Sequence, residues 1–102
     1  MPDDAEILKA LAAQFRMDFC DRIPEAIDPT VITLLPAHVA RRYSTVPLAR
    51  QLSGGRDRVT VAISDPLDVD TIDSLRYITK LNIDAVIAPK SEIKAALRRF
   101  YS

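Results

Sequence analysis

The sequence has very few of the residues from which catalytic, redox and metal sites are built. It holds one cysteine, Cys20, one histidine, His38, and no tryptophan. A single cysteine excludes an internal disulfide and favours a reducing compartment. A nucleophile needs a base beside it, and one cysteine with one histidine leaves a zinc site incomplete without carboxylates. We interpret Cys20 as a buried thiol and His38 as a surface imidazole; the alternative is that the two side chains pair.

The sequence also has few glycines, no net charge and no long apolar run. The two glycines, Gly54 and Gly55, precede a strand-like run rather than a helix, so they do not form a Walker-type phosphate loop. Lysine plus arginine equals aspartate plus glutamate at fourteen each, which leaves no basic surplus for nucleic acid or an anionic membrane. No apolar run approaches the ~20 residues that span a bilayer. The acidic start, Met1 to Asp4, is unlike a signal peptide. We expect a cytoplasmic chain that binds no nucleic acid and does not insert into a membrane.

The apolar content of 48% over 102 residues is enough for one folded domain spanning residues 1–102. Helical spacing predicts a first helix over residues 5–15, with Ile7, Leu8, Leu11 and Phe15 on one face. Asp28-Pro29 starts a short helix, and Pro36 opens another turn that reaches Tyr43. Ser91 caps a last helix, whose buried side is Ile93, Ala96, Leu97 and Phe100.

The middle of the chain has the period of strands. Residues 45–51 and 58–64 flank the Gly54-Gly55 turn and predict an antiparallel hairpin, with Pro47 placing the first strand at an edge. Asp68 caps a helix over 69–80, which leads to a third strand over 83–88. We expect the following to face inward: Val59, Val61, Ile63, Ile72, Leu75, Ile78, Ile83, Ala85 and Ile87. Arg58, Thr60 and Ala62 should face outward.

A strand, a helix and a second strand in this spacing predict a parallel pair with a right-handed crossover. Together with the hairpin, this gives a small mixed three-stranded sheet. Its faces need cover from the helices, so the expected fold class is α+β, a two-layer sandwich of a sheet and helices.

Two groups of charged residues are candidate sites. Four aspartates, Asp65, Asp68, Asp70 and Asp73, are suggestive of a Ca²⁺ or Mg²⁺ site, but they lack the glycine and terminal glutamate of an EF-hand. We interpret them as turn and helix-cap residues, and expect no metal, cofactor or catalytic residue. The basic pairs Arg41-Arg42 and Arg98-Arg99 suit helix C-termini; with Tyr43, Phe100 and Tyr101 beside them, they are also typical of protein interfaces.

Several segments in order resemble one family along nearly the whole chain. They are Ile27-Asp28-Pro29 through Leu34-Leu35-Pro36, Ala40-Arg41-Arg42-Tyr43 with Val46-Pro47-Leu48, Val59-Thr60-Val61-Ala62 with Asp65-Pro66-Leu67-Asp68, Thr71 through Arg76, Ala88-Pro89 with Ile93, and the Arg98–Tyr101 ending. This pattern resembles the N-terminal domain of the type II secretion ATPase, the E protein of the general secretory pathway, and of type IV pilus assembly ATPases.

The resemblance implies a non-catalytic, cytoplasmic interaction domain that precedes a separate ATPase core. It implies docking of that motor to the cytoplasmic part of an inner-membrane secretion or pilus protein. Some relatives bind cyclic di-GMP through tandem leucine-and-glycine motifs. This sequence has only the tail of one such motif, from Leu8 to Gln14, so cyclic di-GMP sensing is the alternative function.

The candidate partner surface has two parts. The first helix has few charges, and small residues surround its apolar stripe, which leaves room for close approach by another chain: Ala5, Ala10, Ala12 and Ala13. The second part is the basic and aromatic run Arg41, Arg42 and Tyr43. The other interpretation of the first helix is that it simply packs on its own sheet.

Overall fold

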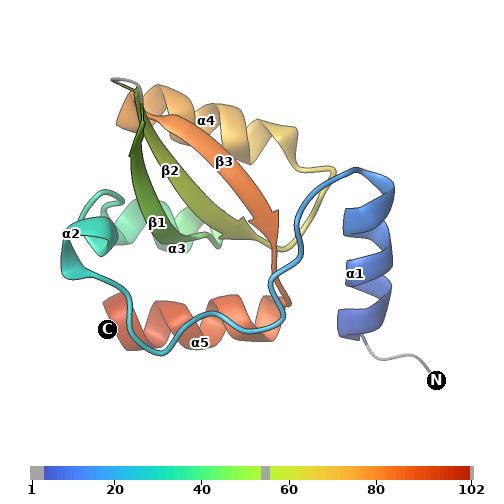
Figure 1. Cartoon of the computed structure of the whole chain (residues 1–102). Helices are drawn as coiled ribbons and strands as arrows, with labels where there is room; N and C mark the ends of the chain where they lie inside the picture. Colours follow the sequence, from blue (N-terminus) through green and yellow to red (C-terminus); the bar gives the residue numbers. More distant parts are fainter. Residues whose placement is uncertain (1–3, 54–55, 102) are drawn as a thin grey trace.

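The computed structural model describes residues 4–53 and 56–101, and a three-stranded mixed sheet lies at its centre in the order β1-β2-β3 (Figure 1). Strand β1 (Val46–Ser53) is antiparallel to β2 (Arg56–Ile63), and β2 is parallel to β3 (Asn82–Ile87). The predicted turn at Gly54-Gly55 lies outside the described residues. The hairpin is confirmed by the pairing on either side of it, and the edge position of β1 fits Pro47, which has no N–H to donate.

The described residues form five helices around the sheet: α1 (Asp4–Gln14), α2 (Pro29–Ile32), α3 (Ala37–Tyr43), α4 (Val69–Thr79) and α5 (Lys90–Tyr101). Asp28 and Asp68 are the predicted N-caps, accepting from the backbone N–H of Thr30 at 2.9 Å and of Thr71 at 3.2 Å. Helices α3 and α4 end at residues with left-handed backbone, Ser44 and Lys80.

The prediction that Ser91 caps α5 is wrong. The helix begins at Lys90, so Ser91 is already its second residue. The carbonyl of Pro89 accepts from the N–H groups of Glu92 and Ile93 at 3.0 and 3.1 Å, which starts the helical hydrogen bonding before Ser91 can cap it. Pro89 has no backbone N–H, so this residue leaves no unpaired donor directly before the helix.

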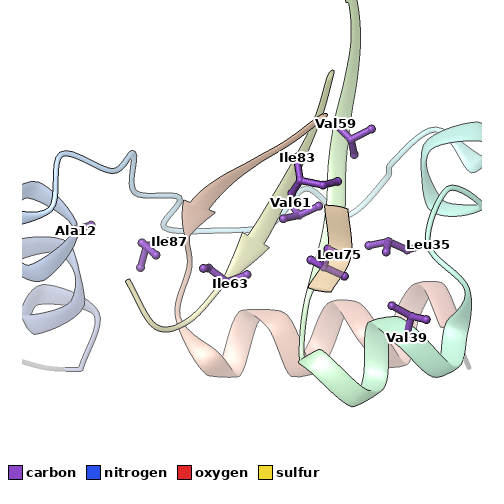
Figure 2. Close-up of a cluster of buried hydrophobic side chains, with 9 residues drawn as sticks. All are labelled: Ala12, Leu35, Val39, Val59, Val61, Ile63, Leu75, Ile83 and Ile87. Atoms are coloured by element: carbon purple, nitrogen blue, oxygen red, sulfur yellow. The ribbon is translucent and has the colours of Figure 1, made fainter. Parts of the chain in front are cut away.

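The main buried cluster lies on one face of the sheet and joins α1, α3 and α4 to strands β2 and β3 (Figure 2). Three alternate residues of β2 have side chains that are at most 2% exposed: Val59, Val61 and Ile63. The cluster consists of Ala12, Leu35, Val39, Val59, Val61, Ile63, Leu75, Ile83 and Ile87, with Ile72 and Ala85 packed partly buried against it. The predicted inward pattern on the two parallel strands is confirmed.

A second buried cluster lies on the opposite face, where α5 packs. Ala62, expected to face outward, is fully buried there with Val46, Ile93 and Ala96. The outward prediction for Ala62 is therefore wrong, because α5 and the segment around Ile23 cover the face that strand alternation alone leaves open. The α+β class and the mixed sheet are confirmed, and the sheet has helices on both faces.

Ile78 also departs from the expected pattern. Leu75 is fully buried under α4, but Ile78 is 43% exposed. It lies near the C-terminal end of α4, where Lys80 turns the chain away from the helix, so less of the sheet lies beneath it. Within the described residues, no helix is long and apolar enough to cross a membrane.

Candidate functional site

Helix α1 packs through a narrow line rather than through its whole apolar stripe. Ala12 is fully buried in the main cluster, and Leu8, one turn earlier, is partly buried against it. The carbonyl of Ala12 also accepts from the N–H of Met17 at 2.8 Å, which fixes the turn after the helix. Because alanine has a short side chain, the helix backbone approaches the sheet closely at this point. Ala12 therefore belongs to the core.

The other predicted residues of α1 are placed differently. Ala10 and Ala13 are exposed, and the side chain of Ala5 lies outside the described residues. Three large apolar side chains spaced four residues apart remain open to solvent: Ile7 at 49%, Leu11 at 38% and Phe15 at 44%. This spacing places them along one face of α1 and its C-terminal turn. We call Ile7, Leu11 and Phe15 the α1 stripe.

The second predicted set, at the end of α3, is partly structural. The Arg41 guanidinium donates to the main-chain carbonyl of Tyr101 and so ties α3 to the end of α5. Arg42 lies over the Tyr43 ring, with its guanidinium carbon 5.5 Å from the ring centroid. Tyr43 is partly buried against the main cluster, whereas Arg41 and Arg42 are exposed.

Tyr101 makes a second contact at the end of α5. Its hydroxyl donates to the carbonyl of Ile32 at 2.9 Å, and burial raises the pKa of Tyr101 to about 12. The structure does not bring the two predicted sets together: α1 lies at one end of the sheet, and α3 with the end of α5 at the other (Figure 1).

The acidic cluster is structural, as expected. Asp65 accepts from the N–H of Leu67 at 2.9 Å, Asp68 caps α4, and Asp73 pairs with Arg76 at 3.3 Å. Among residues 4–53 and 56–101, no group of three His, Cys, Asp or Glu side chains is arranged to hold a metal ion.

Cys20 is half-buried, and its thiol donates to the carbonyl of Arg22 at 3.0 Å. Burial raises the pKa of Cys20, which keeps it in the unreactive thiol form. His38 is exposed on α3. Over the described part of the chain, no hydrogen bond joins Cys20 to His38, so the geometry gives no nucleophile–base pair.

Comparison with known proteins places the chain in a family. A family model described as the MshEN domain matches residues 15–102. The chain belongs to the MshEN domain family. The type IV pilus assembly ATPase PilB of Myxococcus xanthus (strain DK1622) is 26% identical over 100 residues, which make up 98% of this chain and 17% of PilB. The MshEN chain thus spans about a sixth of that relative.

Solved structures agree. A structure of MshE with cdg matches with a TM-score of 0.81 and 28% identity, over 97% of this chain and 69% of that one. The N-terminal domain of XpsE matches with a TM-score of 0.76 and 21% identity, over 93% and 65% of the two chains, and shows the shared fold. The resemblance to N-terminal domains of type II secretion and type IV pilus ATPases is confirmed.

Proposed function

We propose that residues 1–102 act as a single interaction and regulatory domain of a secretion or pilus-assembly ATPase, with no catalysis of their own. In this proposal the domain precedes the ATPase core of a longer protein. It docks the motor, on the cytoplasmic side, to the cytoplasmic part of an inner-membrane platform protein. Membership of the MshEN family supports the assignment to a secretion or pilus-assembly ATPase. The exposed α1 stripe is the observation that supports docking.

The α1 stripe has the character of a contact surface. Single exposed apolar side chains are common, but three in line on one helix form a continuous apolar strip. A helix that lays such a strip on a partner contacts it at positions spaced three or four residues apart. Ala10, which is exposed beside the stripe, leaves room for a partner to come close, and the exposed Ala13 lies farther around the helix.

The test is a pull-down of the partner's cytoplasmic domain by variants of α1. We expect Leu11→Glu to weaken capture, because it places a charge in the middle of the stripe. Ile78→Glu is the matched control: Ile78 is an apolar side chain of similar exposure on α4, and it should bind as the parent does. Both variants should keep the parent melting temperature within a few degrees, since surface changes usually stay within ~0.5 kcal/mol.

A second α1 variant maps how far the contact extends around the helix. Ala13→Glu changes an exposed position, and we expect it to weaken capture without unfolding the domain. Ala12→Glu, one residue away, should unfold the domain, because Ala12 is fully buried. Normal capture by both Leu11→Glu and Ala13→Glu would remove α1 from the interface.

The alternative function is cyclic di-GMP sensing. The observation that favours it is the similarity to the structure of MshE with cdg, together with Ala10, Leu11 and Gln14, which match the tail of the nucleotide motif. With one partial motif, we expect no binding tighter than ~100 µM in calorimetry, a weak affinity in free-energy terms. Micromolar, saturable binding that Gln14→Ala abolishes would establish sensing as a function of this chain.

A further inference from the structure

A basic surface lies on the side of the domain where α3 and α5 meet. It consists of six exposed cations, two at the end of α3 and four on the outer side of α5, and we call it the basic face: Arg41, Arg42, Lys90, Lys94, Arg98 and Arg99. Lys90, Lys94 and Arg98 are spaced four residues apart and so line one side of α5 over about 12 Å. The bond from Arg41 to the Tyr101 carbonyl holds the α3 pair beside the end of α5.

The cations of the basic face have no carboxylate partners among the described residues. All the ion pairs that the structure shows lie elsewhere: Arg50 with Asp57, Arg58 with Asp84, and Arg76 with Asp73. On α5 itself, the carboxylate of Glu92 accepts from the backbone N–H of Ile23 at 3.0 Å and so stabilises the core side of the helix. Asp21 and Glu25, in the segment beside α5, form no ion pair with the basic face.

We propose that the basic face binds an acidic segment of a partner protein, rich in aspartate and glutamate. Six like charges on one surface repel one another, and an acidic partner offsets that repulsion. Four of the six are arginines, whose planar guanidinium groups bind carboxylates through two parallel hydrogen bonds. The inference rests on the proposed role of this chain as an interaction domain, and it names the chemistry of the partner.

Three of the four arginines are also held in place, which favours a protein over a fluid membrane surface. Arg42 lies over the Tyr43 ring, and Arg99 lies over the Phe100 ring with 5.7 Å between the guanidinium carbon and the centroid. Arg41 is held by the Tyr101 carbonyl. Guanidinium groups fixed in this way lose less side-chain entropy when they bind a matching set of carboxylates.

The first test uses the ¹⁵N-labelled chain and a peptide of ten glutamates. Saturable amide shifts are expected at the basic face, and affinity should fall about tenfold between 0.1 and 1 M NaCl, where the screening length drops from ~10 to ~3 Å. Lys94→Glu should weaken binding about fivefold or more. The matched control Lys80→Glu makes the same charge change at an exposed residue of the opposite side and should stay within about twofold.

Three results would overturn the proposal. One is the absence of saturable shifts on α3 and α5; another is an equal loss from Lys94→Glu and Lys80→Glu, which marks a general charge effect. The third is binding to phosphatidylcholine vesicles with phosphatidylglycerol but not to the peptide, which makes the surface a membrane contact. If the parent captures no platform protein yet binds the peptide at this face, the proposed function fails and the acidic-partner inference stands.

Discussion

Replacing Val61 with aspartate tests the central packing of the sheet. Val61 is fully buried in the middle strand, where it pairs with Ala85 of β3 and Pro47 of β1. Every buried member of the surrounding cluster is apolar (Figure 2), so the cluster itself supplies no cation to pair with the carboxylate. Burial of this depth raises an aspartate's pKa by about 3–5 units, to about 7 or above. Holding the carboxyl protonated at pH 7 costs about 1.4 kcal/mol for each unit by which pH 7 exceeds its unfolded pKa of about 3.9.

The expected loss is therefore about 4 kcal/mol at pH 7, before any loss of apolar contacts. A domain of this size has ~5–15 kcal/mol of stability in total, so Val61→Asp should be largely unfolded or close to it at 25 °C. Val61→Ala removes two methyl groups and should cost about 2 kcal/mol, or roughly 8 °C in melting temperature. Ala49→Asp, at an exposed position of the edge strand, should cost less than about 1 kcal/mol.

The pH dependence separates charge burial from simple misfit. The pKa of an aspartate at position 61 is raised in the folded state, so folding is favoured below the unfolded pKa of about 3.9 and loses stability as pH rises. Urea midpoints measured by circular dichroism should show Val61→Asp gaining stability from pH 7 to pH 4.5 relative to Val61→Asn, which does not titrate there. A Val61→Asp protein that melts like the parent, or that shows no such gain, would refute the strand register.

Two further predictions concern single contacts, and a third concerns ATP hydrolysis. Because burial raises the pKa of Tyr101 to about 12, its neutral form stabilises the fold below pH 10, and stability should fall as pH rises from 10 to 12; Tyr101→Phe should lack this alkaline loss in thermal melts. Hydrogen bonds from Thr30 lower the pKa of Asp28, so Asp28 should titrate below its usual range by NMR, and Thr30→Ala, which removes the hydroxyl donor, should raise that pKa. The purified chain should not hydrolyse ATP, because it has no Walker motif; phosphate release above a buffer blank that survives further purification contradicts this.

The strands and most helices were predictable because their signals are local. Alternation along residues 58–63 identifies β2, and Asp28 and Asp68 cap helices through side chains within three residues of the hydrogen bonds they accept. Such patterns need no knowledge of what lies across the core. The faces of β2 and β3 followed from the same alternation, since one slipped residue would turn every apolar side chain to the other face.

Long-range packing was harder to predict. Periodicity placed Ile7, Leu8, Leu11 and Phe15 on one face and left open whether that face packs on the sheet or meets a partner; in the structure, Leu8 and Ala12 are the residues of α1 that join the main cluster. The sequence could not show that α1 touches the sheet along a single narrow line, because that depends on where the chain turns after Met17 to pair Phe19 with Ile87. Ala62 was misplaced for a related reason: it shares its face of β2 with the polar residues Arg58 and Thr60, so that face looks exposed until a helix from about thirty residues later covers it.

The basic face shows why a total charge is a weak guide to a surface. The fourteen cations balance fourteen carboxylates, which argued against any polyanion as a partner. The structure shows that this balance is not local: three arginines of β1, β2 and α4 pair with aspartates, while Arg41, Arg42 and the cations of α5 gather where α3 meets α5, without a carboxylate partner among the described residues. Spacing along α5 alone could have indicated this, because Lys90, Lys94 and Arg98 recur every four residues opposite Ile93 and Ala96. Salt screens the interactions of an exposed cation beyond about one screening length, ~10 Å at 0.1 M salt. A partner's binding therefore depends on the charges of the surface that it contacts, and not on the net charge of the domain.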